Sequence, residues 1–357
     1  MAPARTDEIS RYLEAHSPPR DGCGNRTSRL AAAEGLRLGS SSGRFAESRG
    51  PLESQAGVVR HVSHPLDNIA AVLEGTGDYR VLRRLEPLAD RPEAPDEPTF
   101  VDLVVDVETT GTDFAADEVI ELGILKFEYG LSGRIDRVLD TLNQLHQHSK
   151  PIPSEISRLT GISDADVAGQ QIDDAAVARI AADAAVVIAH NASFDRQMCE
   201  PRWPVFQEKN WACSCHQIPW RAEGHEGMKL GYLLTDYGFF HRGHRAIDDC
   251  HALLALLAKP LRISGTLTLS ALLETARKPT VRLWAQGSPI ETKDLLKARR
   301  YRWSGSRRCW YVDLDEDQIE IEHGFLAGQI YRRPVTGLSA DRFTARDRFS
   351  ARTDPDR

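Results

Sequence analysis

From residue 100 onward, runs of apolar residues alternate with turn-forming segments and predict a sheet with helices. The run FVDLVVDV, Phe100 to Val107, is apolar and β-branched, which is typical of a buried strand. In the next run, Ile120, Leu122 and Ile124 share one face because side chains alternate along a strand. In all, we predict strands at residues 100–107, 118–130, 134–145 and 185–191.

Helical spacing appears between and after these strands. Leu253, Leu254 and Leu257 recur as the core-facing stripe of one helix. We predict helices within residues 151–163, at 173–185, from Ser193 onward, within 229–239 and within 243–257. The order of three strands, helices, a strand and further helices indicates a mixed sheet flanked by helices, an α/β fold class.

The regions outside this core differ in composition. Residues 1–56 are rich in Ser, Gly and charge, so we expect a disordered N-terminal extension. Residues 57–97 predict a helical extension and linker, with helical periodicity across 64–87 and three prolines within 91–100. Beyond these, we expect an α/β domain at 98–262, a small α+β module at 263–335 and a disordered tail at 336–357.

Composition narrows the classes of protein. The length of 357 residues suits about two domains. The hydrophobic fraction of 41% is enough for at least one full-sized core. The net charge of −7 means that binding of a polyanion requires a local basic patch or metal ions. No run of about 18 apolar residues exists, so we expect no membrane span. The six cysteines lack framework spacing, which indicates reduced thiols and a cytoplasmic location.

Paired carboxylates end the first predicted strand. Asp106 and Glu108 are two residues apart, so their side chains point to the same face. Two like charges this close repel each other unless cations neutralise them. Taken alone, the pair is better explained as two solvated carboxylates at a strand end, because the D-x-E pattern is common.

Three further acidic residues lie near predicted helix starts. Asp195 follows the strand AVVIAH, and Asp248 and Asp249 follow His244 in GHRAIDD. Each acid alone could be an N-terminal residue favoured by the helix macrodipole. Together with the strand pair, however, four carboxylates and one histidine suit two hard divalent cations and a base. Because the donors are oxygen atoms with a single histidine, Mg²⁺ or Mn²⁺ is favoured over zinc.

The motifs DVETTG, HNASFD and HRAIDD occur in this order at residues 106–111, 190–195 and 244–249. In order and spacing they resemble the DEDDh 3′→5′ exonucleases, a DnaQ-like family that includes the proofreading epsilon subunit of bacterial DNA polymerase III. The segment PIPSEISRLTGIS (151–163) also resembles that family's pattern. The resemblance covers about residues 100–260, and the three motifs together make it specific.

The resemblance implies a ribonuclease H-like fold and a set of roles for individual residues. His244 would be the general base, and Asp248 falls outside the H-x-A-x-x-D pattern that Asp249 completes. The two metal ions would be bound by Asp106, Glu108, Asp195 and Asp249. Substrate contacts would come from Thr109, Thr110, His190 and Phe194. For His190 and Phe194, a strand-end histidine and a core aromatic are equally good interpretations.

Two further segments carry candidate chemistry. Residues 292–311, TKDLLKARRYRWSGSRRCWY, combine basic side chains with Tyr301, Trp303, Trp310 and Tyr311. This pattern suits single-stranded nucleic acid, and it equally suits a small domain whose large side chains form its core. In WACSCHQIPW (211–220), the spacing of the cysteines favours partly buried thiols over a zinc site.

These observations predict a metal-dependent 3′→5′ exonuclease that releases nucleoside 5′-monophosphates. By analogy with the family, we expect DNA 3′ ends, single-stranded or frayed, as the substrate. A DNA polymerase or repair complex is the expected partner. An exoribonuclease with the same site is the nearest alternative. The other alternative is a non-catalytic nucleic-acid-binding or polymerase-scaffold protein, but such copies usually lose one of the carboxylates.

Overall fold

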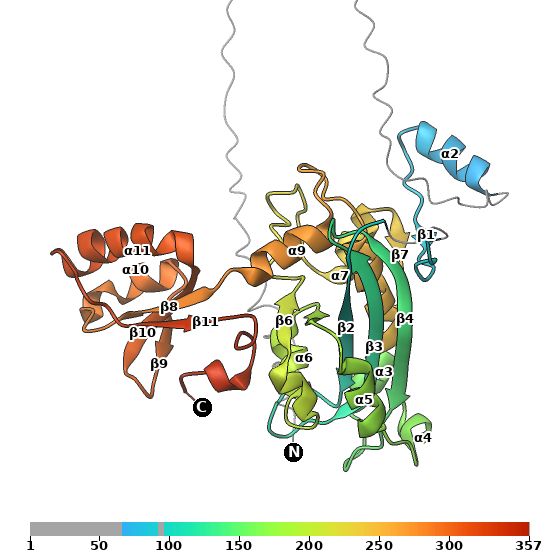
Figure 1. The fold of residues 1–357 in the computed structure, drawn as a ribbon, viewed down its shortest axis with the longest axis horizontal. Helices are drawn as coiled ribbons and strands as arrows, with labels where there is room; N and C mark the ends of the chain where they lie inside the picture. Colours follow the sequence, from blue (N-terminus) through green and yellow to red (C-terminus); the bar gives the residue numbers. More distant parts are fainter. Residues whose placement is uncertain (1–65, 92–95, 357) are drawn as a thin grey trace, which may run out of the picture. The chain divides into compact units, whose positions relative to one another are not determined.

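The computed structural model describes residues 66–91 and 96–356. The predicted disordered extension at 1–56 and part of the predicted linker, 92–95, lie outside these residues. A five-stranded sheet forms the centre of the larger domain, in the order β4-β3-β2-β5-β6 (Figure 1). Its strands are β2 (Thr99–Thr109), β3 (Val119–Gly130), β4 (Ile135–Leu145), β5 (Val186–Ala189) and β6 (Asn210–Cys213).

The sheet is mixed, as the sequence predicts. β2, β3 and β4 are antiparallel neighbours, whereas β2, β5 and β6 run parallel. Apolar side chains on both faces of β2 make it the central, fully covered strand. The mixed α/β architecture is therefore confirmed, and β6, which lies in the cysteine-containing segment, is the strand that was not predicted.

Helices cover both faces of this sheet. Leu103, Val105 and Val107 pack in one cluster with residues of α5 and α6, and Val104 packs in another with residues of α8. The helices of this domain are α3 (Ser154–Thr160), α4 (Asp164–Val167), α5 (Asp174–Ala181), α6 (Ala192–Cys199), α7 (Leu230–Asp236), α8 (Ala246–Leu257) and α9 (Thr268–Arg277), with the 3₁₀ turn η1 (Pro204–Glu208). None of the helices in the described part of the chain is long and apolar enough to cross a membrane.

The boundary between domain and module lies further along the chain than expected. Leu269, Leu272 and Leu273 of α9 are buried in the same cluster as α8, so α9 belongs to the larger domain. The predicted boundary at 262/263 is therefore wrong, because the periodicity of α9 does not reveal which core it joins. The small sheet begins only at β8 (Thr280–Ala285).

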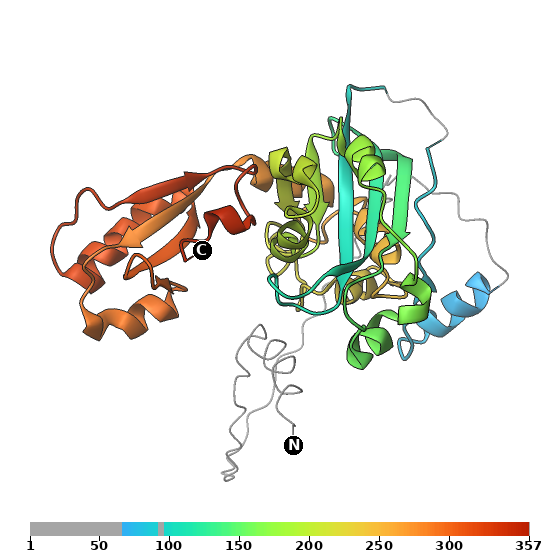
Figure 2. The same cartoon turned by 90° about the horizontal axis from the view of Figure 1, so that it is seen from below.

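The small module is an antiparallel sheet covered by helices on one face (Figure 2). Its strand order is β11-β8-β10-β9. Its elements are β8, η2 (Ile290–Thr292), α10 (Lys293–Ala298), β9 (Arg302–Ser304), β10 (Cys309–Asp315), η3 (Glu316–Gln318), α11 (Ile319–Phe325), η4 (Leu326–Tyr331) and β11 (Ala340–Phe343). The predicted α+β character of this module is confirmed.

The predicted disordered tail at 336–357 is wrong for the residues described. β11 pairs with β8 from Ala340 to Phe343, and a 3₁₀ turn, η5 (Ala351–Thr353), follows. Arg348 and Ser350 are both buried. The composition of this segment is polar, yet its polar groups have partners far away in the sequence, which local composition does not encode.

The helical extension before the larger domain is only half helical. α2 (Asp67–Gly75) fits the predicted periodicity, but Val81, Leu82 and Leu85 lie in extended backbone. The chain turns at Gly77, whose φ is +81°, and then forms β1 (Arg83–Arg84). β1 pairs in parallel with β7 (Phe239–Phe240), which explains why the second half of the predicted helix is extended.

Candidate active site

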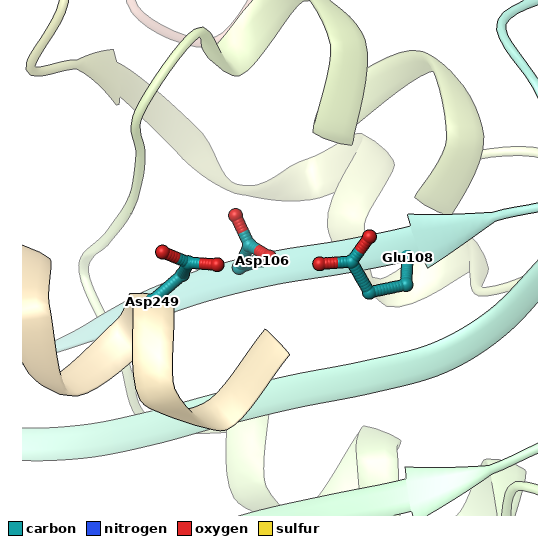
Figure 3. Close-up of side chains that lie close together, drawn as sticks. All are labelled: Asp106, Glu108 and Asp249. Carbon is teal, nitrogen blue, oxygen red and sulfur yellow. The ribbon is translucent and has the colours of Figure 1, made fainter. Parts of the chain in front are cut away.

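Three carboxylates meet beside the last part of β2. Asp106 and Glu108 come from β2, and Asp249 comes from the first turn of α8. One oxygen from each lies within 4.8 Å of the others. Figure 3 shows the three side chains turned toward one another. Strand alternation places the first two on the α8 side of the sheet, and the helix start supplies the third.

The electrostatics of this group indicate a place for cations. Burial is the main cause that raises the pKa of Asp106 well above its ordinary range, and the charge of Asp195 is the next cause. Burial, followed by the charge of Asp249, raises the pKa of Glu108 to about 8. Hard divalent cations take oxygen ligands of this kind and would neutralise the repulsion. The donor set therefore fits Mg²⁺ or Mn²⁺.

Asp195 lies beside this group without belonging to it. The residue is 3% exposed on α6, and its charge acts on Asp106 more strongly than that of Asp249. Burial raises the pKa of Asp195 to about 8, although main-chain hydrogen bonds, one of them involving Val107, oppose the rise. The backbone of Asn191, with φ of +80°, forms the sharp turn from β5 into α6 that brings Asp195 here.

The first turn of α8 is fixed by a residue that the sequence did not single out. Glu121 of β3 is fully buried and accepts from the guanidinium of Arg245 at 2.8 Å and from the main-chain N–H of Ala246 at 3.1 Å. Gly123 lies under the same turn, where an added Cβ would come within 2.6 Å of the carbonyl carbon of Ala246. The available signal was an acidic residue within the apolar run VIELGIL at the start of β3.

Two histidines contact or adjoin Asp249. His241, which the sequence did not single out, places Nε2 2.7 Å from Oδ1 of Asp249. The main-chain N–H of His244 donates to Oδ2 at 2.7 Å, and the residue has a φ of +65°. The imidazole of His244 is exposed and has no hydrogen-bond partner among the described residues. The sequence feature that could have pointed to His241 is its position three residues before His244, in HRGH.

The threonines after Glu108 order the adjoining loop. The hydroxyl of Thr109 donates to the carbonyl of Gly111 at 2.5 Å. The hydroxyl of Thr110 donates to Asp117 at 2.9 Å, and its main-chain N–H donates to the carbonyl of Glu118. The main-chain N–H and the hydroxyl of Thr110 therefore both have partners within this loop, and its contact with substrate stays a prediction.

The other two predicted substrate contacts are built into the domain. His190 has both ring nitrogens engaged, with Ser214 Oγ at 2.8 Å and the carbonyl of Met228 at 2.8 Å. Burial lowers its pKa to about 4, so the ring is neutral. Phe194 is partly buried against the core and lies 5.8 Å, centroid to centroid, from Phe114. Both residues fit the packing interpretation given above.

The aromatic residues of the small module lie mostly in its interior. Tyr301 and Tyr311 are buried, and Trp310 packs against the module's core. Arg302 stacks over Tyr311 and pairs at 2.5 Å with Asp313, a carboxylate that it shares with Arg282. Trp303, 49% exposed, is the large aromatic of this stretch that remains open to solvent. The core interpretation therefore explains most of the pattern.

The cysteine-containing segment supplies packing to the larger domain. Cys213 is buried at the end of β6, and Cys215 is partly buried beside it. Among the described residues, the acidic triad is the group of three His, Cys, Asp or Glu side chains close enough to hold a metal ion. The interpretation of Cys213 and Cys215 as thiols thus agrees with their surroundings.

A mixed sheet covered by helices, with carboxylates gathered at its central strand, defines a nuclease domain of the ribonuclease H-like class. Residues 103–257 match the family model described as exonuclease, RNase_T. Residues 103–257 are therefore an RNase T/DnaQ-like 3′→5′ exonuclease domain, which confirms the resemblance predicted from the three motifs.

Among curated proteins, the chain is similar to DNA polymerases III of the PolC type. The protein of Caldanaerobacter subterraneus subsp. tengcongensis is 32% identical over 196 residues, 53% of this chain and 13% of the relative. That of Staphylococcus saprophyticus is 26% identical over 187 residues, 49% of this chain and 12% of the relative. The chain therefore spans about an eighth of the length of these relatives.

Solved exonuclease structures are also similar. Exonuclease X in complex with 5′-overhanging duplex DNA is 22% identical, covering 44% of this chain and 88% of that one, with a TM-score of 0.34. E. coli exonuclease I in complex with a dA16 oligonucleotide is 16% identical, covering 70% and 64%, with a TM-score of 0.40. A 3′-exonuclease that recognises histone mRNA stem-loop is 15% identical, covering 48% and 67%, with a TM-score of 0.37.

Proposed function

We propose that this protein is a metal-dependent 3′→5′ exonuclease that hydrolyses the terminal phosphodiester of DNA and releases nucleoside 5′-monophosphates. The observation that carries the proposal is the convergence of Asp106, Glu108 and Asp249 within 4.8 Å in an exonuclease-family domain. Asp195 adds a fourth carboxylate whose charge acts on Asp106. A cluster of carboxylates suits a reaction at a phosphodiester, because these side chains would hold divalent cations that also attract the phosphate of a substrate.

The carboxylates of Asp106, Glu108, Asp195 and Asp249 would hold two Mg²⁺ or Mn²⁺ ions. When bound, such ions supply Lewis-acid activation of water and stabilise charge on the leaving oxygen. His244 takes the role of general base, because its exposed imidazole has no competing partner and can accept the proton of the attacking water at a ring nitrogen. His241 orients the carboxylate of Asp249 through its Nε2 contact.

We further propose that the enzyme works on DNA ends beside a polymerase or within a repair complex. The support for this is the similarity to DNA polymerases III of the PolC type, of which this chain spans only a small part. The loop ordered by Thr109 and Thr110 borders the carboxylates and would adjoin the terminal nucleotide. RNA is the alternative substrate, and the experiment below includes it.

The proposal is tested with 5′-labelled oligonucleotides and added Mg²⁺ or Mn²⁺. DNA with a 3′-terminal mismatch and RNA of the same sequence are compared for the wild type, Asp106→Ala and Asp249→Ala. We expect ladders of shortened DNA from the wild type, and loss of about 10³-fold or more in both variants because each removes metal ligands. Faster shortening of the RNA than of the DNA would show that RNA is the preferred substrate.

Asp248→Ala is the matched control. Asp248 precedes Asp249 on the same helical turn, but it is not one of the three clustered carboxylates and instead lines a hollow with Arg84, His241 and His251. Asp248→Ala removes one negative charge, as Asp249→Ala does, but it leaves all four proposed metal-binding carboxylates in place. Activity is therefore expected to stay near that of the wild type. Absence of ladders from the wild type on both substrates, or equal activity in all variants, contradicts the proposed function.

A further inference from the structure

We infer that Arg196 is a positioning residue for Asp195 and that the C-terminal segment, residues 344–352, holds Arg196 in place. The inference rests on the proposed function only for the metal-binding role of Asp195. Arg196 follows Asp195 directly in α6, and its side chain is completely buried in the larger domain. A fully buried guanidinium is rare in proteins and requires hydrogen-bond acceptors around it.

Most of those acceptors come from the other end of the chain. Nη1 of Arg196 donates to the carbonyl of Arg348 at 2.6 Å and to that of Ala345 at 3.4 Å. Nη2 donates to the carbonyl of Arg346 at 2.8 Å. Within α6 itself, Nε donates to Glu200 Oε1 at 2.6 Å. Three main-chain contacts, to residues 345, 346 and 348, therefore depend on the C-terminal segment having its folded path.

That path is fixed by contacts of its own. Asp347 accepts from both the main-chain N–H and the hydroxyl of Thr344, at 2.9 and 2.8 Å, which closes a tight turn. The N–H of Trp211, in β6, donates to the carbonyl of Ala345 at 2.8 Å. Ser350 donates to Glu200 Oε2 at 2.6 Å, so both partners of the Arg196–Glu200 pair contact the segment.

The arrangement couples the segment to the candidate active site. Without residues 344–352, the guanidinium of Arg196 would retain Glu200, lose its three carbonyl acceptors and become open to water on that side. The lost hydrogen bonds could then be replaced only by solvent, so the side chain would turn outward toward water. Because Asp195 is its immediate neighbour on a helix of eight residues, α6 would turn with it and carry Asp195 away from Asp106.

The competing explanation is that the contacts between Arg196 and the C-terminal segment only stabilise the fold. Their loss would then lower the free energy of unfolding and leave metal binding of the folded protein unaltered. A positioning role changes the metal affinity of the folded protein. The side chain of Arg346 offers a matched control, since that side chain is exposed and only its carbonyl contacts Arg196.

The experiment compares four proteins: wild type, a chain ending at Phe343, Arg196→Lys and Arg346→Ala. Mn²⁺ binding is measured by calorimetry without DNA, followed by kcat and KM on single-stranded DNA for each folded protein. We expect the truncated chain and Arg196→Lys to bind Mn²⁺ about 10- to 100-fold more weakly, with a fall in kcat and little change in KM. Arg346→Ala should match the wild type.

Unchanged Mn²⁺ affinity in the folded truncated chain and in Arg196→Lys overturns the inference. If the truncated chain does not fold, Arg196→Lys decides alone, because one ammonium cannot reproduce the planar fork that reaches three carbonyls. Hydrogen exchange of the amides of α6 separates this inference from the proposed function. Should the wild type bind no Mn²⁺, faster exchange confined to α6 of Arg196→Lys, with the rest of the larger domain exchanging as in Arg346→Ala, still supports the positioning role. Faster exchange throughout the domain, or equal exchange in α6, refutes it.

Discussion

Arg245 closes over the buried carboxylate of Glu121, with Nη2 2.8 Å from Oε1. The main-chain N–H of Ala246 donates to the other oxygen of the same carboxylate at 3.1 Å. One side chain of β3 thus binds both the residue before α8 and the first residue of α8. Asp249 follows one turn later, so this pair sets where α8 presents its carboxylate.

Removing one partner of this pair should destabilise the protein strongly. Arg245→Ala leaves Glu121 buried without its cation, and we expect a loss of about 3–5 kcal/mol in the free energy of unfolding, measured with urea. The double variant Glu121→Ala with Arg245→Ala should lose less than Arg245→Ala alone, since no charge remains uncompensated. A loss in the double variant that equals or exceeds the loss in Arg245→Ala contradicts this account.

The raised pKa values of the acidic group predict an unusual dependence of stability on pH. The pKa of Glu108 is raised from 4.5 to about 8, and that of Asp195 from 3.8 to about 8. The folded state therefore holds protons that the unfolded state has released. This contribution is complete below about pH 4 and is lost as pH rises through about 8.

The metal-free protein is accordingly expected to have a higher unfolding temperature at pH 5 than at pH 9. Each kcal/mol of lost stability lowers that temperature by roughly 2–4 °C. Saturating Mg²⁺ should remove most of the difference, because cations neutralise the carboxylates. Thermal unfolding in EDTA measures the effect, and Glu108→Gln should reduce it. Glu274→Gln, on the exposed side of α9, is the control that should leave it unchanged.

The two histidines near Asp249 should differ in their effects on turnover and on metal binding. Loss of the general base in His244→Ala should lower kcat by about 10²–10⁴-fold, with unchanged Mn²⁺ affinity. Loss of the Asp249 contact in His241→Ala should instead weaken Mn²⁺ binding by about 10-fold or more. Calorimetry and steady-state kinetics on one DNA substrate distinguish the variants. The reverse pattern would assign the base to His241.

Replacing each of two tryptophans of the small module by alanine should change stability by very different amounts. Trp284 is 1% exposed and donates from Nε1 to Asp341 at 2.8 Å, so Trp284→Ala should lower stability by about 3–5 kcal/mol. Trp303 is 49% exposed, and Trp303→Ala should change stability by less than about 1 kcal/mol. Urea unfolding measures both. A comparable loss in Trp303→Ala would show that this ring is part of the core.

Local patterns predicted the central parts of the fold and of the site. Alternation along β2 places Asp106 and Glu108 on one face, and the helical register of α8 separates Asp249 from Asp248. Such relationships depend on neighbours within a few residues. They therefore remain visible in a single sequence.

The parts that sequence did not predict depend on partners far apart in the chain. Glu121 acquires its role from Arg245, and Arg196 is satisfied by main-chain carbonyls near Arg348. A carbonyl is present at every residue, so no side-chain pattern marks the three that Arg196 uses. For the same reason, the polar composition of residues 344–352 predicts disorder, and only the folded structure shows that this segment surrounds the buried guanidinium of Arg196.

Gly123 has a consequence for variation and engineering of this domain. The spacing between β3 and the start of α8 leaves no room for a methyl group, since an added Cβ would lie 2.6 Å from the main chain of Ala246. Even Gly123→Ala would push the turn that carries Asp249 outward. Selection for nuclease activity should thus act on a position that has no side chain, and directed evolution of this domain would do well to leave residue 123 out of its libraries.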